Sequence, residues 1–176
     1  LYDELILTGN QIRQVPVSSF NGLKVKRLYL DDNPIERVES GALVELANYL
    51  EELVISVNSQ QQQQQMTPSE KPRLSASLFQ SLLNLKIVKF NGLDLIGSFS
   101  PPSESGDDDV GLLRANTFNR TRKLEMIHLV DAGLVKLERN SFAGIESTLR
   151  ELNLDNNQLT SNEDIFNELK RMKRLQ

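Results

Sequence analysis

Apolar residues recur along this chain in a fixed pattern, and its clearest mark is two apolar positions separated by one residue. Residues 5–12, 28–35 and 152–159 all read Leu-x-Leu-x-x-Asn-x-Leu, with isoleucine at the last position in two of them. Another apolar residue, three positions before each pair, marks the start of a unit. The starts at positions 2, 25, 50, 85, 124, 149 and 172 are 23, 25, 35, 39, 25 and 23 residues apart. Self-similarity on this scale predicts a stack of repeated coils.

The two halves of each unit predict different local structures. Alternation at Leu5 and Leu7 is typical of a short strand that points those two side chains into the core. An asparagine such as Asn10 then turns the chain, and an aromatic or aliphatic residue such as Phe20 fills the far side of the coil. A single coil cannot bury both sets of side chains, whereas stacked coils bury them continuously.

We therefore expect a single α/β domain over residues 1–176, a right-handed solenoid of about six and a half coils. A parallel β-sheet should line its concave face, with turns and short helices on its convex face. A helix is expected over residues 162–172, because Asn162 or Ser161 can cap an acidic first turn and Lys170 to Lys173 form a basic end.

Two units are lengthened by insertions near residues 59–73 and 96–112, and both insertions enter just after the strand and its turn. The first contains Gln60 to Gln65, whose composition favours a disordered surface loop over coiled-coil or aggregation behaviour. The second contains Asp107 to Asp109. A calcium loop needs spaced oxygen ligands that end in a glutamate, a pattern these residues do not follow. We expect no metal site and no cofactor.

The asparagine at the ninth position of each unit is expected to bond its side-chain amide to backbone groups of its own coil and of the next. The residues at that position that fit are Asn10, Asn33, Asn58 and Asn157. Leu93 and Ala132 replace the asparagine in the fourth and fifth units. An unpaired buried backbone group costs roughly 1–3 kcal/mol, so water or a rearranged turn must compensate there. We expect the centre of the array to be its least regular part.

Charge and composition exclude several classes of function. The chain has 20 basic and 24 acidic side chains and a net charge of −4, so it lacks the basic surface that nucleic acid requires. No stretch approaches the roughly 18 consecutive apolar residues of a membrane-spanning helix, so direct membrane insertion by this segment is not expected. Cysteine is absent and His128 is the sole histidine, on an outward position of its strand. Without a nucleophile–base pair we expect no catalysis.

The residues between the buried positions of each strand should form the concave face, because side chains alternate between faces. In an array these residues align in columns across the coils. An apolar strip within such a face is typical of a protein-binding surface, although β-branched and aromatic residues also suit a strand in its own right. Tyr29 is the best anchor candidate, since tyrosine is enriched among residues that dominate binding energy. We predict that a protein partner docks on Ile6, Arg27, Tyr29, Glu52, Val54, Ile87, Lys89, Met126, His128 and Asn153.

The tripeptide Asn119-Arg120-Thr121 is the only acceptor sequence for N-linked glycosylation in the chain. It follows Phe118 on the outer side of its coil, where a bulky glycan would meet solvent rather than a neighbouring coil. Asn119 is therefore our candidate glycosylation site, and its occupancy would place the protein in the secretory pathway.

Two stretches of the chain, Ile12 to Leu23 with its Phe20-Asn-Gly-Leu23 ending and Asn140 to Ile145, resemble the extracellular "typical" class of leucine-rich repeats. Within that class, residues 142–154 are similar to insect chaoptin-like adhesion proteins, and residues 46–53 carry a similar additional residue before the strand. Slit proteins and Toll-like receptor ectodomains use closely similar repeats. The resemblance covers nearly the whole chain apart from the two insertions.

This resemblance implies an extracellular or membrane-tethered glycoprotein that works in adhesion or recognition, with cysteine-bearing end caps and a membrane anchor outside these residues. The chain starts and stops within a unit, so we expect it to be a segment of a longer protein. Its open ends predict self-association. Two alternatives stay open: the ligand-binding ectodomain segment of a signalling receptor, and a cytoplasmic adaptor that regulates a phosphatase or GTPase.

Overall fold

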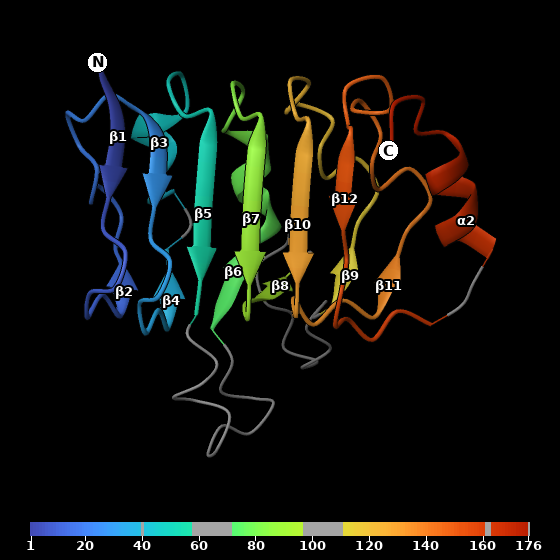
Figure 1. Ribbon diagram of the computed structural model, residues 1–176, viewed down its shortest axis with the longest axis horizontal. Coiled ribbons are helices and arrows are strands. Elements are labelled where there is room, and N and C mark those ends of the chain that lie inside the picture. Colours follow the sequence, from blue (N-terminus) through green and yellow to red (C-terminus); the bar gives the residue numbers. More distant parts are fainter. Residues whose placement is uncertain (40, 58–71, 97–110, 161–162, 176) are drawn as a thin grey trace.

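Successive units each contribute one strand to a parallel sheet, which we call the main sheet. The computed structural model describes residues 1–39, 41–57, 72–96, 111–160 and 163–175 (Figure 1). The strands lie side by side in chain order, and each is parallel to its neighbours. They are β1 Tyr2–Ile6, β3 Val25–Tyr29, β5 Glu52–Ser56, β7 Ile87–Asn91, β10 Met126–Val130 and β12 Glu151–Asn153.

The register of the main sheet confirms the predicted row of inward-facing side chains. One residue of each strand pairs with the next, which gives the row Leu5, Leu28, Leu53, Val88, Ile127 and Leu152. The four central members are fully buried. Leu5 and Leu152 are half-buried, because each end strand has a hydrogen-bonded neighbour on one side only. The prediction of a solenoid with a parallel sheet is therefore confirmed.

Short strands that follow the turn of each coil form two smaller parallel sheets, which the sequence did not predict. Stacking in register brings these extended segments within reach of one another, so that their backbones pair. The first sheet contains β2 Gln14–Val15, β4 Arg37–Val38, β6 Arg73–Ser75 and β8 Asp94–Ile96, and the second contains β9 Leu112–Leu113 and β11 Lys136–Leu137.

The smaller sheets correct the predicted limits of both insertions. Arg73, Ile96 and Leu112 lie in strands, so the predicted insertions were each too long at their edges. The first insertion enters before the short strand of its coil, whereas the second enters after β8 and before β9. The predicted common entry point is therefore wrong. The break between the two smaller sheets falls at this second insertion, in agreement with the expected irregular centre.

Aromatic rings pack in a row behind the main sheet. The ring centroid of Phe118 lies 4.7 Å from that of Phe79 and 5.7 Å from that of Phe142, and all three side chains are fully buried. Such ring pairs contribute about 0.5–1.5 kcal/mol beyond the burial of their area. Phe20 is buried as well, and Leu43 fills the equivalent place in the second coil. The predicted role of this position in the core is confirmed.

The 3-10 helices lie behind the main sheet, as predicted, and α2 lies beyond β12 at the C-terminal end of the array (Figure 1). They are the 3-10 helices η1 Val44–Leu46 and η3 Ala76–Gln80, and the α-helix α2 Glu163–Lys170. The expected helix over residues 162–172 is thus present but ends at Lys170. Its proposed caps, at positions 161 and 162, lie outside the described residues.

One buried acid fastens α2 to the preceding coil. Glu168 is only 2% exposed, and its carboxylate accepts hydrogen bonds from the backbone N–H of Asn140 at 2.8 Å and from Arg171 at 3.3 Å. Arg171 also forms a salt bridge with Glu146 at 3.1 Å. A carboxylate that is paired and hydrogen-bonded in this way is tolerated in the core, so α2 is held in one orientation.

Asparagine side chains tie two of the coils to the coil before them. Asn33 is fully buried, and its Nδ2 donates to the carbonyl oxygens of Leu7 in the first coil, at 2.8 Å, and of Leu30, at 3.0 Å. Its Oδ1 accepts from the N–H of Ile12 at 3.1 Å. Asn157 repeats this arrangement against the fifth coil. The predicted ladder is therefore present, but its direction is corrected, since the amides reach the preceding coil and not the next.

The predicted interruption at Leu93 and Ala132 is bridged by the backbone. Both side chains are buried, and the N–H of Leu95 donates to the carbonyl oxygen of Ala132 at 3.2 Å. In the first coil the equivalent N–H, that of Ile12, donates instead to Oδ1 of Asn33. A rearranged turn, one of the two predicted remedies, thus provides the compensation. Asn10 bonds only within its own coil, and Asn58 lies outside the described residues.

Candidate functional site

The residues predicted to bind a partner lie together on the face of the main sheet that points away from the core, which we call the open face. It corresponds to the predicted concave face. Every predicted residue is exposed or half-buried there. Third-position residues form one row, Glu4, Arg27, Glu52, Ile87, Met126 and Glu151, and fifth-position residues form another, Ile6, Tyr29, Val54, Lys89, His128 and Asn153.

Tyr29 lies between Ile6 and Val54, its register partners on β1 and β5. Ile6 is 61% exposed, while Tyr29 and Val54 are half-buried. Burial raises the pKa of the Tyr29 phenol above its ordinary value, and the charge of Glu52 and a hydrogen bond with it raise the pKa further. The phenol therefore stays protonated at neutral pH and presents an apolar ring with a polar tip.

The positive charge of Arg27 is already matched by Glu4. Its Nη2 and Nε lie 2.8 Å and 3.0 Å from Oε1 of Glu4. This hydrogen bond is the main cause that raises the pKa of Arg27 above its ordinary value. Both side chains are more than a third exposed, so solvent screens the pair and its contribution to stability is small.

The other half of the open face combines an apolar pair with a contact between a histidine and a carboxylate. Ile87 and Met126 are register partners on β7 and β10 and are both half-buried. His128 points outward as predicted, and its Nε2 lies 2.5 Å from Oε1 of Glu151. The side-chain oxygen of Asn153 accepts a hydrogen bond from a backbone N–H within its own coil. The open face therefore offers apolar contacts between charges that are largely paired.

Positive and negative charges alternate along the N-terminal ends of the main-sheet strands, a feature that we did not infer from the sequence. Salt bridges join these charges in successive pairs: Lys26 to Asp3 at 2.9 Å, Lys86 to Glu51 at 2.8 Å, and Arg150 to Glu125 at 3.5 Å. The hydrogen bond with Lys26 lowers the pKa of Asp3, and that with Lys86 lowers the pKa of Glu51. The sequence did contain this pattern, because the charge at the second position of each unit is opposite to that in the next unit. We call this row the charged rim: Asp3, Lys26, Glu51, Lys86, Glu125 and Arg150.

Asn119 is exposed in the turn that connects β9 with β10, outside the main sheet. The neighbouring Thr121 is buried, and its hydroxyl donates to the carbonyl oxygen of Phe118 at 3.0 Å. The asparagine of the acceptor sequence thus reaches solvent while its threonine anchors the turn. The predicted outward placement is confirmed, and the glycan itself stays a prediction.

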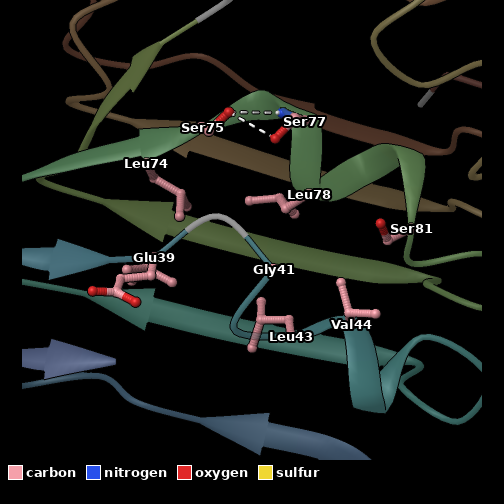
Figure 2. Close-up of a pocket in the computed structure, with 10 residues that line it drawn as sticks. Glu39, Gly41, Leu43, Val44, Leu74, Ser75, Ser77, Leu78 and Ser81 are labelled. Atoms are coloured by element: carbon pink, nitrogen blue, oxygen red, sulfur yellow. Dashed lines mark hydrogen bonds between the residues drawn. The ribbon is translucent and has the colours of Figure 1, made fainter. Parts of the chain in front are cut away.

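A hollow of about 260 Å³ lies between the second and third coils, on the side of the helices (Figure 2). Leu43, Val44, Leu74 and Leu78 supply much of its apolar lining. The hydroxyls of Ser75 and Ser77 bond to each other at 2.8 Å, and Ser75 also accepts from the N–H of Ser77. Because these polar groups satisfy one another, the hollow offers little that would orient a ligand.

Within the part of the chain that the structure describes, no cluster of three or more His, Cys, Asp or Glu side chains could hold a metal ion. The segments Gln60 to Gln65 and Asp107 to Asp109 fall outside those residues. No helix in the described ranges has the length and apolar character needed to cross a membrane.

Comparison with known proteins points to one repeat family. The sequence model described as Leucine Rich Repeat matches residues 148–172. The crystal structure of a TLR13–ssRNA13 complex is similar over 98% of this chain and 27% of that chain, with 18% identity and a TM-score of 0.48. The octameric complex of Latrophilin 3, Unc5D and FLRT2 (LRR) matches over 97% and 65%, with 19% identity and a TM-score of 0.30. Human 5T4, or trophoblast glycoprotein, matches over 98% and 77%, with 15% identity and a TM-score of 0.31.

The stacked register of the main sheet, the asparagine amides that bond to the preceding coil and the match over residues 148–172 define an α/β leucine-rich-repeat solenoid. The family match itself covers residues 148–172, and the strands of the other described coils stack in the same register. The chain spans 27% of the first structure named above and 65% of the second.

Proposed function

We propose that this chain is a non-catalytic protein-binding scaffold that works in adhesion or recognition at the cell surface and docks a protein partner on its open face. The observation that carries the proposal is an apolar strip in which Ile6, Tyr29 and Val54 adjoin along one row and Ile87 and Met126 adjoin along the other. Apolar strips bordered by charged side chains are typical of protein interfaces. Stacked-repeat proteins use this kind of surface for binding.

The cell-surface location has separate support. Residues 142–154 resemble chaoptin-like adhesion proteins, and Asn119 presents a glycosylation acceptor to solvent. In this proposal the membrane anchor lies outside these residues. A ligand-binding segment of a signalling receptor is the second candidate, because Toll-like ectodomains use similar repeats. A cytoplasmic adaptor is the third. Self-association through the end coils also stays a prediction.

Replacing Tyr29 and Val54 together by alanine should weaken binding of the physiological partner by at least about tenfold, since buried tyrosines dominate interface energies. The partner would first be recovered with the glycosylated chain and identified, and its affinity would then be measured by surface plasmon resonance. The double variant should keep its unfolding free energy within about 1 kcal/mol of the parent chain, because both side chains face solvent.

A matched control removes the same two residue types from positions outside the main sheet. Tyr49→Ala with Val44→Ala changes a half-buried tyrosine and an exposed valine that lie near η1. This control should bind the partner as the parent chain does. Equal affinity of the open-face variant and the parent would refute the proposed docking surface.

Expression through a secretory pathway should give a chain that carries one N-linked glycan, at Asn119. Digestion with a peptide N-glycosidase should then increase electrophoretic mobility, and Asn119→Gln should abolish that change. Asn21→Gln alters an exposed asparagine that lies outside any acceptor sequence and should leave the change intact. An unmodified protein, whether secreted or retained, would remove the support that this site gives to the extracellular assignment.

A further inference from the structure

One cation stands alone near the centre of the open face. Lys89 is on β7, where it pairs in register with Val54 on β5 and His128 on β10. Ile87 and Asn91 flank it along its own strand and point to the same face, since side chains alternate. Lys89 is half-buried, so part of its hydration is already removed.

Among the residues that the structure describes, none supplies an anion for this ammonium group. Lys89 forms no salt bridge within the described ranges, whereas Arg27 is bound by Glu4 at 2.8 Å and His128 by Glu151 at 2.5 Å. An ammonium group has three hydrogen-bond donors and, when partly desolvated, favours a charged acceptor. A partner that covers the open face must therefore bring its own acceptor or leave this cation buried without one.

Acidic groups lie farther out on both sides. Asp31 follows β3 and Asp155 follows β12, and each of these strands is two places from β7 in the main sheet. Two strand spacings measure about 10 Å, which is the length of about three residues of extended chain. Val54 lies next to Lys89 on β5, and Val130 follows His128 on β10, where the N–H of the next residue donates to the carbonyl oxygen of Asp155 at 3.0 Å. Both valines are half-buried and lie on the way from Lys89 to these acids. Across the strands the open face therefore presents an acid, an apolar side chain, the cation, a second apolar side chain and a second acid.

We infer that the open face binds an extended segment of a partner protein that has the opposite charge order. A carboxylate of that segment sits on Lys89, apolar side chains beside it cover Val54 and Val130, and basic side chains about three residues to either side meet Asp31 and Asp155. This inference rests on the proposed function and specifies the chemistry of its partner.

The test screens the whole chain, immobilised, against a displayed library of random peptides long enough to cross the main sheet. Enriched peptides should share an acidic residue with apolar neighbours and with Lys or Arg about three residues away on each side. Lys89→Glu should lower their affinity by at least about tenfold, because like charges across an interface repel strongly. A second screen with Lys89→Glu should select a basic residue at the central place, and one with Lys89→Gln should select neither charge.

Lys136→Glu is the matched control, because Lys136 is an exposed strand lysine of β11, outside the main sheet. It should change affinity by less than about twofold, as expected of a distant exposed charge. Circular dichroism verifies that each variant is folded. Peptides that lose binding with the Tyr29 and Val54 variant but show no central acid would overturn this inference and leave the proposed function standing. Peptides whose affinity is unchanged in every open-face variant would overturn both this inference and the proposed function. A screen that enriches no peptide would overturn the inference.

Discussion

Phe118→Ala is expected to lower the free energy of unfolding by about 3–5 kcal/mol, the range found when a buried phenylalanine is truncated. Phe118 is fully buried and lies between the rings of Phe79 and Phe142. Its loss would open a cavity that joins three successive coils, and the stacked backbones have little room to close it. Urea denaturation followed by circular dichroism measures the effect.

Phe166→Ala provides the control, because this phenylalanine of α2 is 59% exposed. Its truncation should change stability by no more than about 0.5 kcal/mol. Repeat arrays can unfold in parts, so hydrogen exchange in β7 and β10 should accompany the denaturation curve. A loss below about 1 kcal/mol for Phe118→Ala, with unchanged exchange, would contradict the tight aromatic row.

Asn33→Ala should cost at least about 2 kcal/mol, because it leaves buried backbone groups without partners. The groups affected include the carbonyl oxygen of Leu30 and the N–H of Ile12, both bonded to the Asn33 amide in the structure. The amide of Ile12 should also exchange with solvent faster. Chemical denaturation and hydrogen exchange by NMR measure the two effects.

Asn10→Ala is the corresponding control, since Asn10 is exposed and bonds only to its own coil. Its substitution should change stability by no more than about 0.5 kcal/mol. Unchanged stability and exchange in Asn33→Ala would mean that its turn rearranges as the turn at Ala132 does. The asparagine ladder would then contribute far less to stability than its hydrogen bonds suggest.

Features carried by repeating side chains could be predicted from the sequence. The alternation at Leu28 and Leu30, followed by Asn33, determined which residues face the core and therefore which rows line the open face. The register then followed, because a shift by one residue would expose every buried leucine of a strand. The position of Tyr29 beside Val54 needed no other information.

Features that depend on backbone pairing escaped prediction. Strand β2 contains two residues, and only Val15 gives a side-chain signal there. The bond between Leu95 and Ala132 requires a local turn that no residue pattern marks clearly. Gly133 makes that turn possible, with φ +64° and a position where a Cβ would lie 2.4 Å from Oδ1 of Asp94. Its role became visible only when the neighbouring coil was in place.

The isolation of Lys89 depended on comparing rows rather than single units. Its neighbours in the fifth-position row, Val54 and His128, could be read from the sequence. The pairing of His128 with Glu151 could not, because it joins different rows on adjacent strands. Without that pairing, Glu151 was one of several acids that could have neutralised the lysine.

The charged rim has a consequence for how the number of repeats can change. Loss of the second unit alone would place Asp3 beside Glu51, two like charges, whereas loss of two adjacent units would restore opposite neighbours. Duplication of one unit would likewise place two like charges side by side, whereas duplication of two adjacent units would keep opposite charges adjacent. Solvent screens each exposed pair, so a single like-charged contact would disfavour such a rearrangement only weakly. Units gained or lost in pairs would preserve the alternation of charge along the charged rim, and an unpaired gain or loss within the array would leave two like charges next to each other.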